Sequence, residues 1–299
     1  MPIGALQPVG KRLSFVYIDR CTVHRDANAV TAMDDAGVTN IPAAAMSTLL
    51  LGPGTRITHQ AMVLLGESGV TTCWVGEGGI RIYASAPSLS RSTRLLEAQA
   101  QLVSNRRGRI RVARQMYRMR FPADDVTRAS MQRLRGMEGA RIRAAYRRLA
   151  KQHGVEWKGR HYDPSDWGAG DRVNRALSAA NSCLYGAVHA VIVALGCSPG
   201  LGFIHTGHAL SFVYDIADLY KVDVSIPAAF AVSAGEGDVS SSVRRALREK
   251  IHEHRILERA AVDIHALLGE ERMDGEEDVV RLWEGRTTVP GGISYGIGS

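Results

Sequence analysis

The spacing of hydrophobic and polar positions changes once along the chain, near residue 85. Before that point the apolar residues form short runs, most of them bounded by Gly or Pro, which is typical of β-strands. The expected strands lie at 13–17, 30–33, 38–41, 48–51, 71–75 and 80–83. Thr58 is a suitable N-cap for one short helix that ends at Leu65.

After the change, apolar residues recur every three or four positions, which indicates amphipathic helices. The expected helices lie at 92–121, 130–153, 173–195, 209–221 and 240–268. A Pro/Ser-rich segment between the two halves predicts a linker. We therefore predict an α+β protein with a small N-terminal β domain at 1–86, a linker at 87–91, a larger all-α C-terminal domain at 92–282 and a flexible, Gly-rich tail at 283–299.

Composition narrows the class of protein. A chain of 299 residues with 45% apolar content can bury a large core. Its four cysteines are scattered without a CxxC pair, so we expect neither disulfides nor a zinc knuckle, and a cytoplasmic location. The N-terminus has no signal-peptide pattern. The apolar run 176–195 is long enough to span a membrane, but it contains Asn181 and His189, so we expect a buried core helix and no membrane contact.

Positive charge is concentrated in one region. The formal net charge is only +7, from 37 Lys and Arg against 30 Asp and Glu. Between Arg91 and Arg148, however, we count sixteen arginines and four acids. Arginine makes forked contacts with phosphate groups, so a nucleic-acid surface is favoured, with a solvated helix face as the alternative.

Candidate chemistry is concentrated in residues 202–223. His205 lies on a Gly-bounded turn ahead of an apolar helix that carries Asp215 and Asp218 at i,i+3 spacing. Another acid, Glu138, falls inside the apolar stripe of the helix expected at 130–153. A buried acid is costly unless it is paired or binds a metal. Each residue also has a structural alternative: a Glu138–Arg pair, a core histidine, and an aspartate paired with Lys221.

Taken together, these residues suggest a metal site. One imidazole with carboxylates suits manganese or magnesium better than a thiolate-bound metal. Such a metal can polarise a phosphate and stabilise the attacking or leaving oxygen. A protein that needs both a metal and nucleic acid is most simply an enzyme that transfers phosphodiesters.

Several motifs resemble one known family. The run 202–207 (Gly-Phe-Ile-His-Thr-Gly) and the run 210–218 that follows it closely resemble the CRISPR adaptation integrase family, in the subtype that accompanies the Cascade interference complex. Supporting runs are 52–56, 134–139 and 161–167, and the resemblance covers about residues 10–235.

The resemblance implies an activity and its partners. It implies a divalent metal, Mg²⁺ or Mn²⁺, held by Glu138, His205 and Asp218, which are also the implied catalytic residues, with Asp215 supporting the site or contacting DNA. It implies homodimers, two of which flank a dimer of a small second adaptation protein. The assembly would bind prespacer duplex DNA and join its 3′ hydroxyls to the CRISPR repeat by transesterification. The same site run with water would give endonuclease activity.

The resemblance also implies DNA contacts and shows two departures. The implied contacts are at Arg56, Arg81, Tyr162, Trp167, Lys221, Arg245 and Arg248. His208 stands where relatives commonly have Lys, and Arg20 stands where some have an aromatic residue. Two other hypotheses stay open: a stand-alone metal-dependent DNase that acts on branched DNA in repair, and a non-catalytic DNA-binding scaffold.

Overall fold

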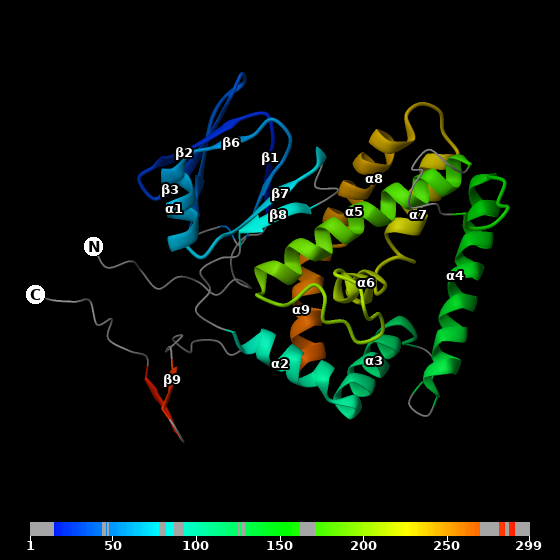
Figure 1. Ribbon diagram of the computed structural model, residues 1–299. Coiled ribbons are helices and arrows are strands. Elements are labelled where there is room, and N and C mark those ends of the chain that lie inside the picture. Colours follow the sequence, from blue (N-terminus) through cyan, green and yellow to red (C-terminus); the bar gives the residue numbers. More distant parts are fainter. Residues whose placement is uncertain are drawn as a thin grey trace, which may run out of the picture.

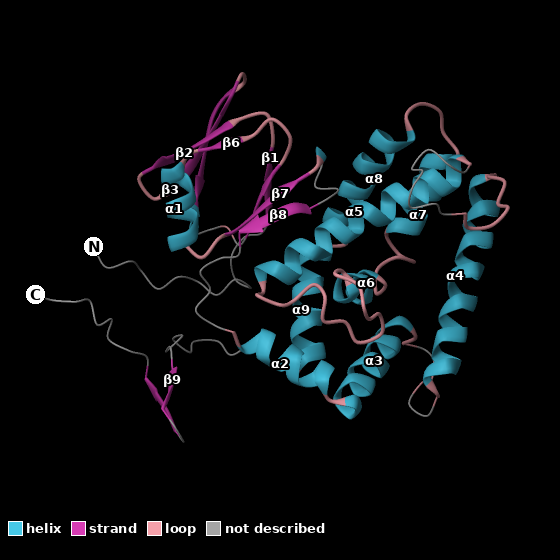
Figure 2. Cartoon of the chain, in the orientation of Figure 1, coloured by secondary structure: helices cyan, strands magenta, loops and turns pink. Residues whose placement is uncertain are grey.

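A strand-rich N-terminal domain precedes a helical domain in the computed structural model of the chain (Figures 1 and 2), which confirms the predicted α+β class. The structure describes residues 15–43, 46, 48–77, 82–86, 93–122, 124, 126, 129–161 and 171–269, and the backbone of 281–284 and 287–290. The predicted linker at 87–91 lies outside the described residues, so the predicted domain boundaries stay predictions.

Two four-stranded sheets form the N-terminal domain. The first has the order β1 (Phe15–Ile18), β5 (Thr48–Leu51), β7 (Thr71–Val75), β8 (Ile82–Ala86), with only β8 antiparallel to its neighbour. The second has the order β4 (Gly37–Pro42), β3 (Ala29–Asp34), β2 (Thr22–Asp26), β6 (Arg56–Ile57). Helix α1 (His59–Glu67) begins after Thr58, whose side chain accepts a hydrogen bond from the Ala61 N–H. The core between these elements includes Val23, Val30, Leu49 and Leu65.

The prediction for this domain was incomplete. Strands β2 and β6 were not expected, because β2 is short and polar (Thr-Val-His-Arg-Asp) and β6 has only two residues. The strand expected at 80–83 is observed at Ile82–Ala86, and residues 80 and 81 lie outside the described part.

The C-terminal domain is built around one central helix (Figure 1). Its helices are α2 (Arg94–Ser104), α3 (Arg106–Arg120), α4 (Met131–His153), α5 (Arg172–Ala194), α6 (Ser211–Ala217), α7 (Ser225–Ser233), α8 (Val239–Glu253) and α9 (Ile256–Leu268). Helix α5 contacts α6, α7, α8 and α9, and it also contacts strands β7 and β8 of the first domain. It therefore joins the helical core to the β domain.

Helix α5 passes a length and composition test for a membrane span, with a mean hydropathy of 1.5 in its most apolar window. More than half of that window, 56%, is buried inside the protein. Leu177, Leu184, Val188 and Ile192 are among its fully buried residues. These contacts agree with the expected core helix.

Two expected helices are interrupted, and a third is shorter than expected. The helix expected at 92–121 is two helices, because the Asn105 side chain accepts hydrogen bonds from the N–H groups of Arg107 and Gly108 and starts α3. The helix expected at 240–268 breaks at Arg255, which has φ of +48°. The one expected at 209–221 covers only Ser211–Ala217. Helix α7 was not expected; its sequence is apolar almost throughout and shows no helical period.

Two short strands are described in and just before the expected tail at 283–299, whose flexibility stays a prediction. Strand β9 (Arg281–Glu284) pairs antiparallel with β10 (Thr287–Pro290). Trp, Thr and Val in these segments favour extended backbone.

Candidate active site

The turn that carries His205 depends on a glycine. A Cβ on Gly202 would collide with the His205 carbonyl oxygen and lie 2.8 Å from the Cβ of Ser211. Only glycine therefore lets the backbone fold this tightly against the start of α6. The turn lies above α3 and beside α6, in the middle of the helical domain (Figure 1).

Asp215 holds this turn in place. Its side chain is fully buried, and its carboxylate accepts hydrogen bonds from the backbone N–H groups of Phe203 (2.5 Å), Ile204 (3.0 Å) and His205 (2.9 Å). The Asp215 backbone carbonyl accepts a further bond from Arg120, at 3.1 Å. Asp215 is thus saturated with donors from the turn that it organises.

The same carboxylate orients the imidazole. His205 Nδ1 lies 2.7 Å from Asp215 Oδ1. Since the carboxylate accepts, Nδ1 carries the proton in the neutral ring and Nε2 keeps its lone pair. The His205 side chain is 42% exposed, so Nε2 belongs to a group that solvent and ligands can reach. Asp215 therefore has the position of a residue that fixes the histidine tautomer.

Asp218 lies just beyond α6, at its C-cap, and not inside a helix as expected. Its Oδ1 lies 2.6 Å from Lys221 Nζ, which is one of the pairings that the sequence left open. Its Oδ2 lies 3.8 Å from the buried Arg120 guanidinium. Burial alone would raise the pKa of Asp218, but the Lys221 and Arg120 charges outweigh it and lower that pKa. Asp218 is accordingly ionised at neutral pH.

Glu138 comes from α4 and faces inward, as its place in the apolar stripe predicted. Its Oε1 lies 3.7 Å from Arg141 Nη1, while its Oε2 is buried without a hydrogen-bond partner in the described part of the chain. Burial raises the pKa of Glu138, and the charges of Arg120 and Arg141 oppose that rise. An unpartnered carboxylate oxygen at a buried position is costly and marks a place where a cation would be favourable.

Two pairs among the three predicted ligands, Glu138–Asp218 and Asp218–His205, lie close enough to influence a pKa. The charge of Asp218 raises the pKa of Glu138, and the charge of His205 lowers the pKa of Asp218. Within the described residues, however, no three His, Cys, Asp or Glu side chains are grouped closely enough to hold a metal ion. The donor types fit Mg²⁺ or Mn²⁺, since they offer carboxylate oxygens and one imidazole nitrogen. To bind a metal together with Glu138 and His205, the Asp218 carboxylate would have to give up its ion pair with Lys221.

Comparison with known proteins identifies the family. The family described as CRISPR associated protein Cas1 matches residues 15–123 and 120–233. The chain belongs to the Cas1 family. A CRISPR-associated endonuclease Cas1 from Clostridium sp. (strain SY8519) is 48% identical over 97% of this chain and 96% of its own. The Cas1 from Escherichia coli K12 is 42% identical, over 83% and 82%.

Solved structures agree. The crystal structure of a TtCas1–DNA complex has a TM-score of 0.79 and 48% identity, and the match covers 88% of this chain and 99% of that one. A Cas1 protein from Thermotoga maritima, at 19% identity and a TM-score of 0.63, shares the fold. The Cas1 family and its enzyme class, an endonuclease, are therefore confirmed. The metal ligands and DNA contacts stay predictions.

The structure of this Cas1-family chain places only some of the predicted DNA contacts. Arg56, Arg245 and Arg248 are exposed. Arg81, Tyr162 and Trp167 lie outside the described residues. Lys221 is paired with Asp218 and lies 4.9 Å from the centre of the Tyr185 ring, so its contacts are with residues of the candidate active site and its neighbours.

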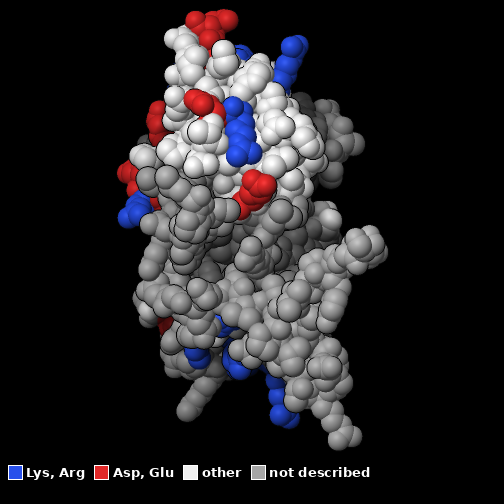
Figure 3. Space-filling model, turned by 90° about the vertical axis from the view of Figure 1, so that its left-hand side faces the viewer, with Lys and Arg blue, Asp and Glu red and all other residues white. Residues whose placement is uncertain are grey.

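Helix α8 also contacts the β domain. The Arg248 guanidinium lies 5.7 Å from the centre of the Tyr17 ring, and Arg244 lies 3.3 Å from Glu77. The upper part of Figure 3, where the β domain lies, shows scattered side chains of both signs on the described surface. Most of the arginine-rich stretch 91–148 lies on helices α2, α3 and α4 of the helical domain.

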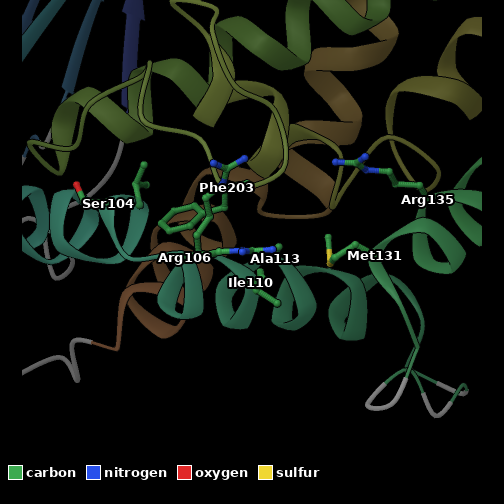
Figure 4. A pocket seen from close by; sticks show the side chains of 9 residues that line it. Ser104, Arg106, Ile110, Ala113, Met131, Arg135 and Phe203 are labelled. Carbon is green, nitrogen blue, oxygen red and sulfur yellow. Dashed lines mark hydrogen bonds between the residues drawn. The ribbon is translucent and has the colours of Figure 1, made fainter.

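The individual residues that line an arginine-rich cavity were not predicted from the sequence. It has a volume of about 380 Å³ and opens between the start of α3 and the start of α4 (Figure 4). Arg106, Arg109 and Arg135 line it together with Phe203, two residues before His205. Arg109 Nε donates to the Phe203 carbonyl at 3.0 Å, which ties the cavity wall to the turn. The number of arginines in 91–148 indicated a basic surface, but it does not say which of these arginines lie on the same face.

The Lys221–Asp218 pair should control stability at low pH. Lys221→Met keeps most of the side-chain volume but leaves Asp218 with Arg120 alone, so we expect a loss of about 2 kcal/mol at pH 7. Because the folded pKa of Asp218 is lowered, its contribution is complete above the unfolded pKa of about 3.9 and is lost as pH falls through the folded value. Urea unfolding of both proteins between pH 2 and pH 7 should show that the gap narrows toward the acid end. A constant gap would contradict this assignment.

Proposed function

We propose that this protein is a metal-dependent DNA endonuclease and integrase of CRISPR adaptation. It binds prespacer DNA and joins its 3′ hydroxyls to the CRISPR repeat. The observation that carries the proposal is the buried, unpartnered Oε2 of Glu138 within electrostatic reach of Asp218, whose carboxylate is in turn influenced by His205. Family membership supports it, since the curated relatives are CRISPR-associated endonucleases and the TtCas1 structure contains DNA.

In the proposed reaction a 3′ hydroxyl oxygen attacks a repeat phosphorus. One P–O bond forms, the bond from that phosphorus to the 3′ oxygen of the adjoining nucleotide breaks, and the leaving 3′ oxygen gains a proton to replace the one that the attacking hydroxyl loses. Glu138, Asp218 and Nε2 of His205 would hold Mg²⁺ or Mn²⁺, which would supply polarisation of the scissile phosphate when bound. Asp215 keeps His205 in the tautomer whose Nε2 has a free lone pair for a metal. Arg120 and Lys221 offset negative charge beside the reacting phosphate. Water in place of the hydroxyl would give hydrolysis.

We further propose the assembly that the family resemblance implies. Homodimers flank a dimer of a small second adaptation protein and act in the cytoplasm. The test is to incubate labelled prespacer DNA with a supercoiled, repeat-bearing plasmid and Mn²⁺, with and without that second protein. Covalently joined product that needs both proteins supports the integrase. Cleavage of branched DNA alone would favour a repair DNase, and DNA binding without any chemistry would favour a scaffold.

The arginine-lined cavity should contribute to DNA affinity through phosphate contacts. Arg106 and Arg135 are exposed and have no acidic partner among the described residues. We expect the Arg106→Met/Arg135→Met variant to bind prespacer DNA about 10-fold more weakly at 0.1 M salt. Its slope of log K against log [salt] should be smaller by about 2, because each phosphate contact contributes roughly 0.9. Fluorescence anisotropy at several salt concentrations measures both quantities.

The Arg147→Met/Arg148→Met variant is the matched control, because both residues are exposed on α4 and neither lines the cavity. It should change neither affinity nor slope by a comparable amount. Equal losses in both proteins would mean that the arginines act only through overall charge.

A further inference from the structure

A second, larger cavity lies between the two domains. Its volume is about 740 Å³, within the range of about 300–1,000 Å³ that is typical of small-molecule sites. The β domain contributes Glu77 and Tyr83 to its lining, and the helical domain contributes Arg172, Arg175 and Arg244. None of the residues that line it belongs to the candidate active site.

Arg172 offers donors that none of the described residues satisfies. Its Nη1 donates to the Gly237 carbonyl at 2.9 Å, which fixes the guanidinium. Its Nε and Nη2 are buried and have no hydrogen-bond partner among the described residues. Buried guanidinium donors without an acceptor are costly, so the position favours an anion. The two atoms lie on one edge of the fork, which matches two oxygens of a phosphate.

The acids that line the cavity are already engaged. Asp238 accepts a hydrogen bond from the Ser241 N–H at 2.8 Å, as the N-cap of α8. Glu77 lies 3.3 Å from Arg244 and 4.0 Å from Arg20. Arg172 and Arg175, three residues apart on one face of α5, have no acidic partner among the described residues. The cavity therefore has an excess of positive charge.

An aromatic ring completes the lining. Tyr83 of β8 is 69% exposed, although it is one of the large hydrophobic side chains. Exposed aromatic rings beside arginines are platforms on which nucleic-acid bases stack. Phosphate binding alone would not need such a ring.

We propose that this interdomain cavity binds a nucleotide, with its phosphate on Arg172 and Arg175 and its base on Tyr83. The ligand would bridge the β domain and the helical domain, so binding would raise the thermal unfolding temperature of the whole chain. The nucleotide can come from the phosphorylated end of a DNA strand or from a free mononucleotide. The proposal does not depend on the proposed reaction, since it involves neither the metal ligands nor catalysis.

The test is isothermal titration of the full-length protein in EDTA with AMP, inorganic phosphate and a 5′-phosphorylated trinucleotide. Saturable binding of AMP or the trinucleotide is expected, weakened about 10-fold by Arg175→Met and by Tyr83→Ala. Arg175 and Tyr83 are exposed, so both variants should fold; Arg147→Met is the control. Binding of AMP would identify the free nucleotide, and binding of the trinucleotide alone would identify a strand end.

Three outcomes would overturn the proposal: no saturable binding by either nucleotide ligand, affinities that neither variant changes, or inorganic phosphate binding as tightly as AMP with no effect of Tyr83→Ala. Glu138→Gln should bind as the wild type does. A failure of strand transfer would therefore leave this result unaffected.

Discussion

Glu138→Gln is expected to reduce strand transfer and DNA cleavage by about 10³-fold, while DNA binding is retained. Gln keeps the shape of the side chain but removes the negative charge that a divalent metal would need. A loss of this size corresponds to about 4 kcal/mol of transition-state stabilisation, within what a positioned metal can supply. Rates should be measured under single-turnover conditions with saturating Mn²⁺, and prespacer affinity by anisotropy in EDTA.

Stability separates this expectation from the scaffold hypothesis. Glu138 Oε2 is buried without a partner, so removing the charge should leave the free energy of unfolding unchanged or slightly higher. If Glu138 were only structural, Gln would lower stability through the lost Arg141 pair and leave the chemistry intact. Glu249→Gln, on the exposed face of α8, is the control and should alter neither quantity. An active Glu138→Gln enzyme would reject the proposed metal site.

Much of the site follows from local sequence pattern. The apolar stripe of α4 put Glu138 on the inner face, because helical period alone decides which positions share a face. The Lys221–Asp218 pair follows from three-residue spacing. That Glu138 and Asp218 influence each other could not be read from the pattern, since it depends on how the fold places α4 relative to the end of α6.

The different roles of Asp215 and Asp218 could not be predicted from the sequence. Asp215 and Asp218 have the same side chain and lie on one short segment, yet their surroundings assign them opposite tasks. The Asp215 carboxylate accepts hydrogen bonds from the turn, whereas the Asp218 carboxylate forms ion pairs with Lys221 and Arg120. This difference arises from the tight turn at Gly202, which points three backbone N–H groups at one carboxylate. No periodic signal encodes that.

Helix breaks were missed for a similar reason. Asn105 and Arg255 interrupt segments whose apolar period continues across the break, so periodicity predicted one helix in each case. Asn105 could have been suspected, because Asn is a strong N-cap and Gly108 follows three residues later. Arg255 has no such signal, since Arg rarely adopts a positive φ.

Asp215→Ala is expected to have the largest effect on stability. It would leave the N–H groups of Phe203, Ile204 and His205 without their acceptor in a buried environment. Each buried unsatisfied donor costs about 1–3 kcal/mol, so we expect the free energy of unfolding to fall by at least about 3 kcal/mol. Urea unfolding at pH 7 measures this loss. Asp223→Asn, at an exposed acid, should stay within about 0.5 kcal/mol of wild type.

Asp215 both holds the turn and orients the His205 ring, and His205→Ala removes only the second of these roles. The His205 side chain is 42% exposed and makes no backbone bond that holds the turn, so its loss should cost about 1 kcal/mol or less while activity disappears.

The stability of the Asp215→Asn variant should fall between those of Asp215→Ala and His205→Ala. An amide accepts through one oxygen only, so it weakens the turn and releases the His205 tautomer, and we expect 10- to 100-fold lower activity in the protein that still folds. If Asp215→Asn were stable and fully active, the carboxylate would neither hold the turn nor orient the ring. The saturation of Asp215 by four donors argues against that result, because a neutral amide at that position must face at least one of those donors with its own N–H.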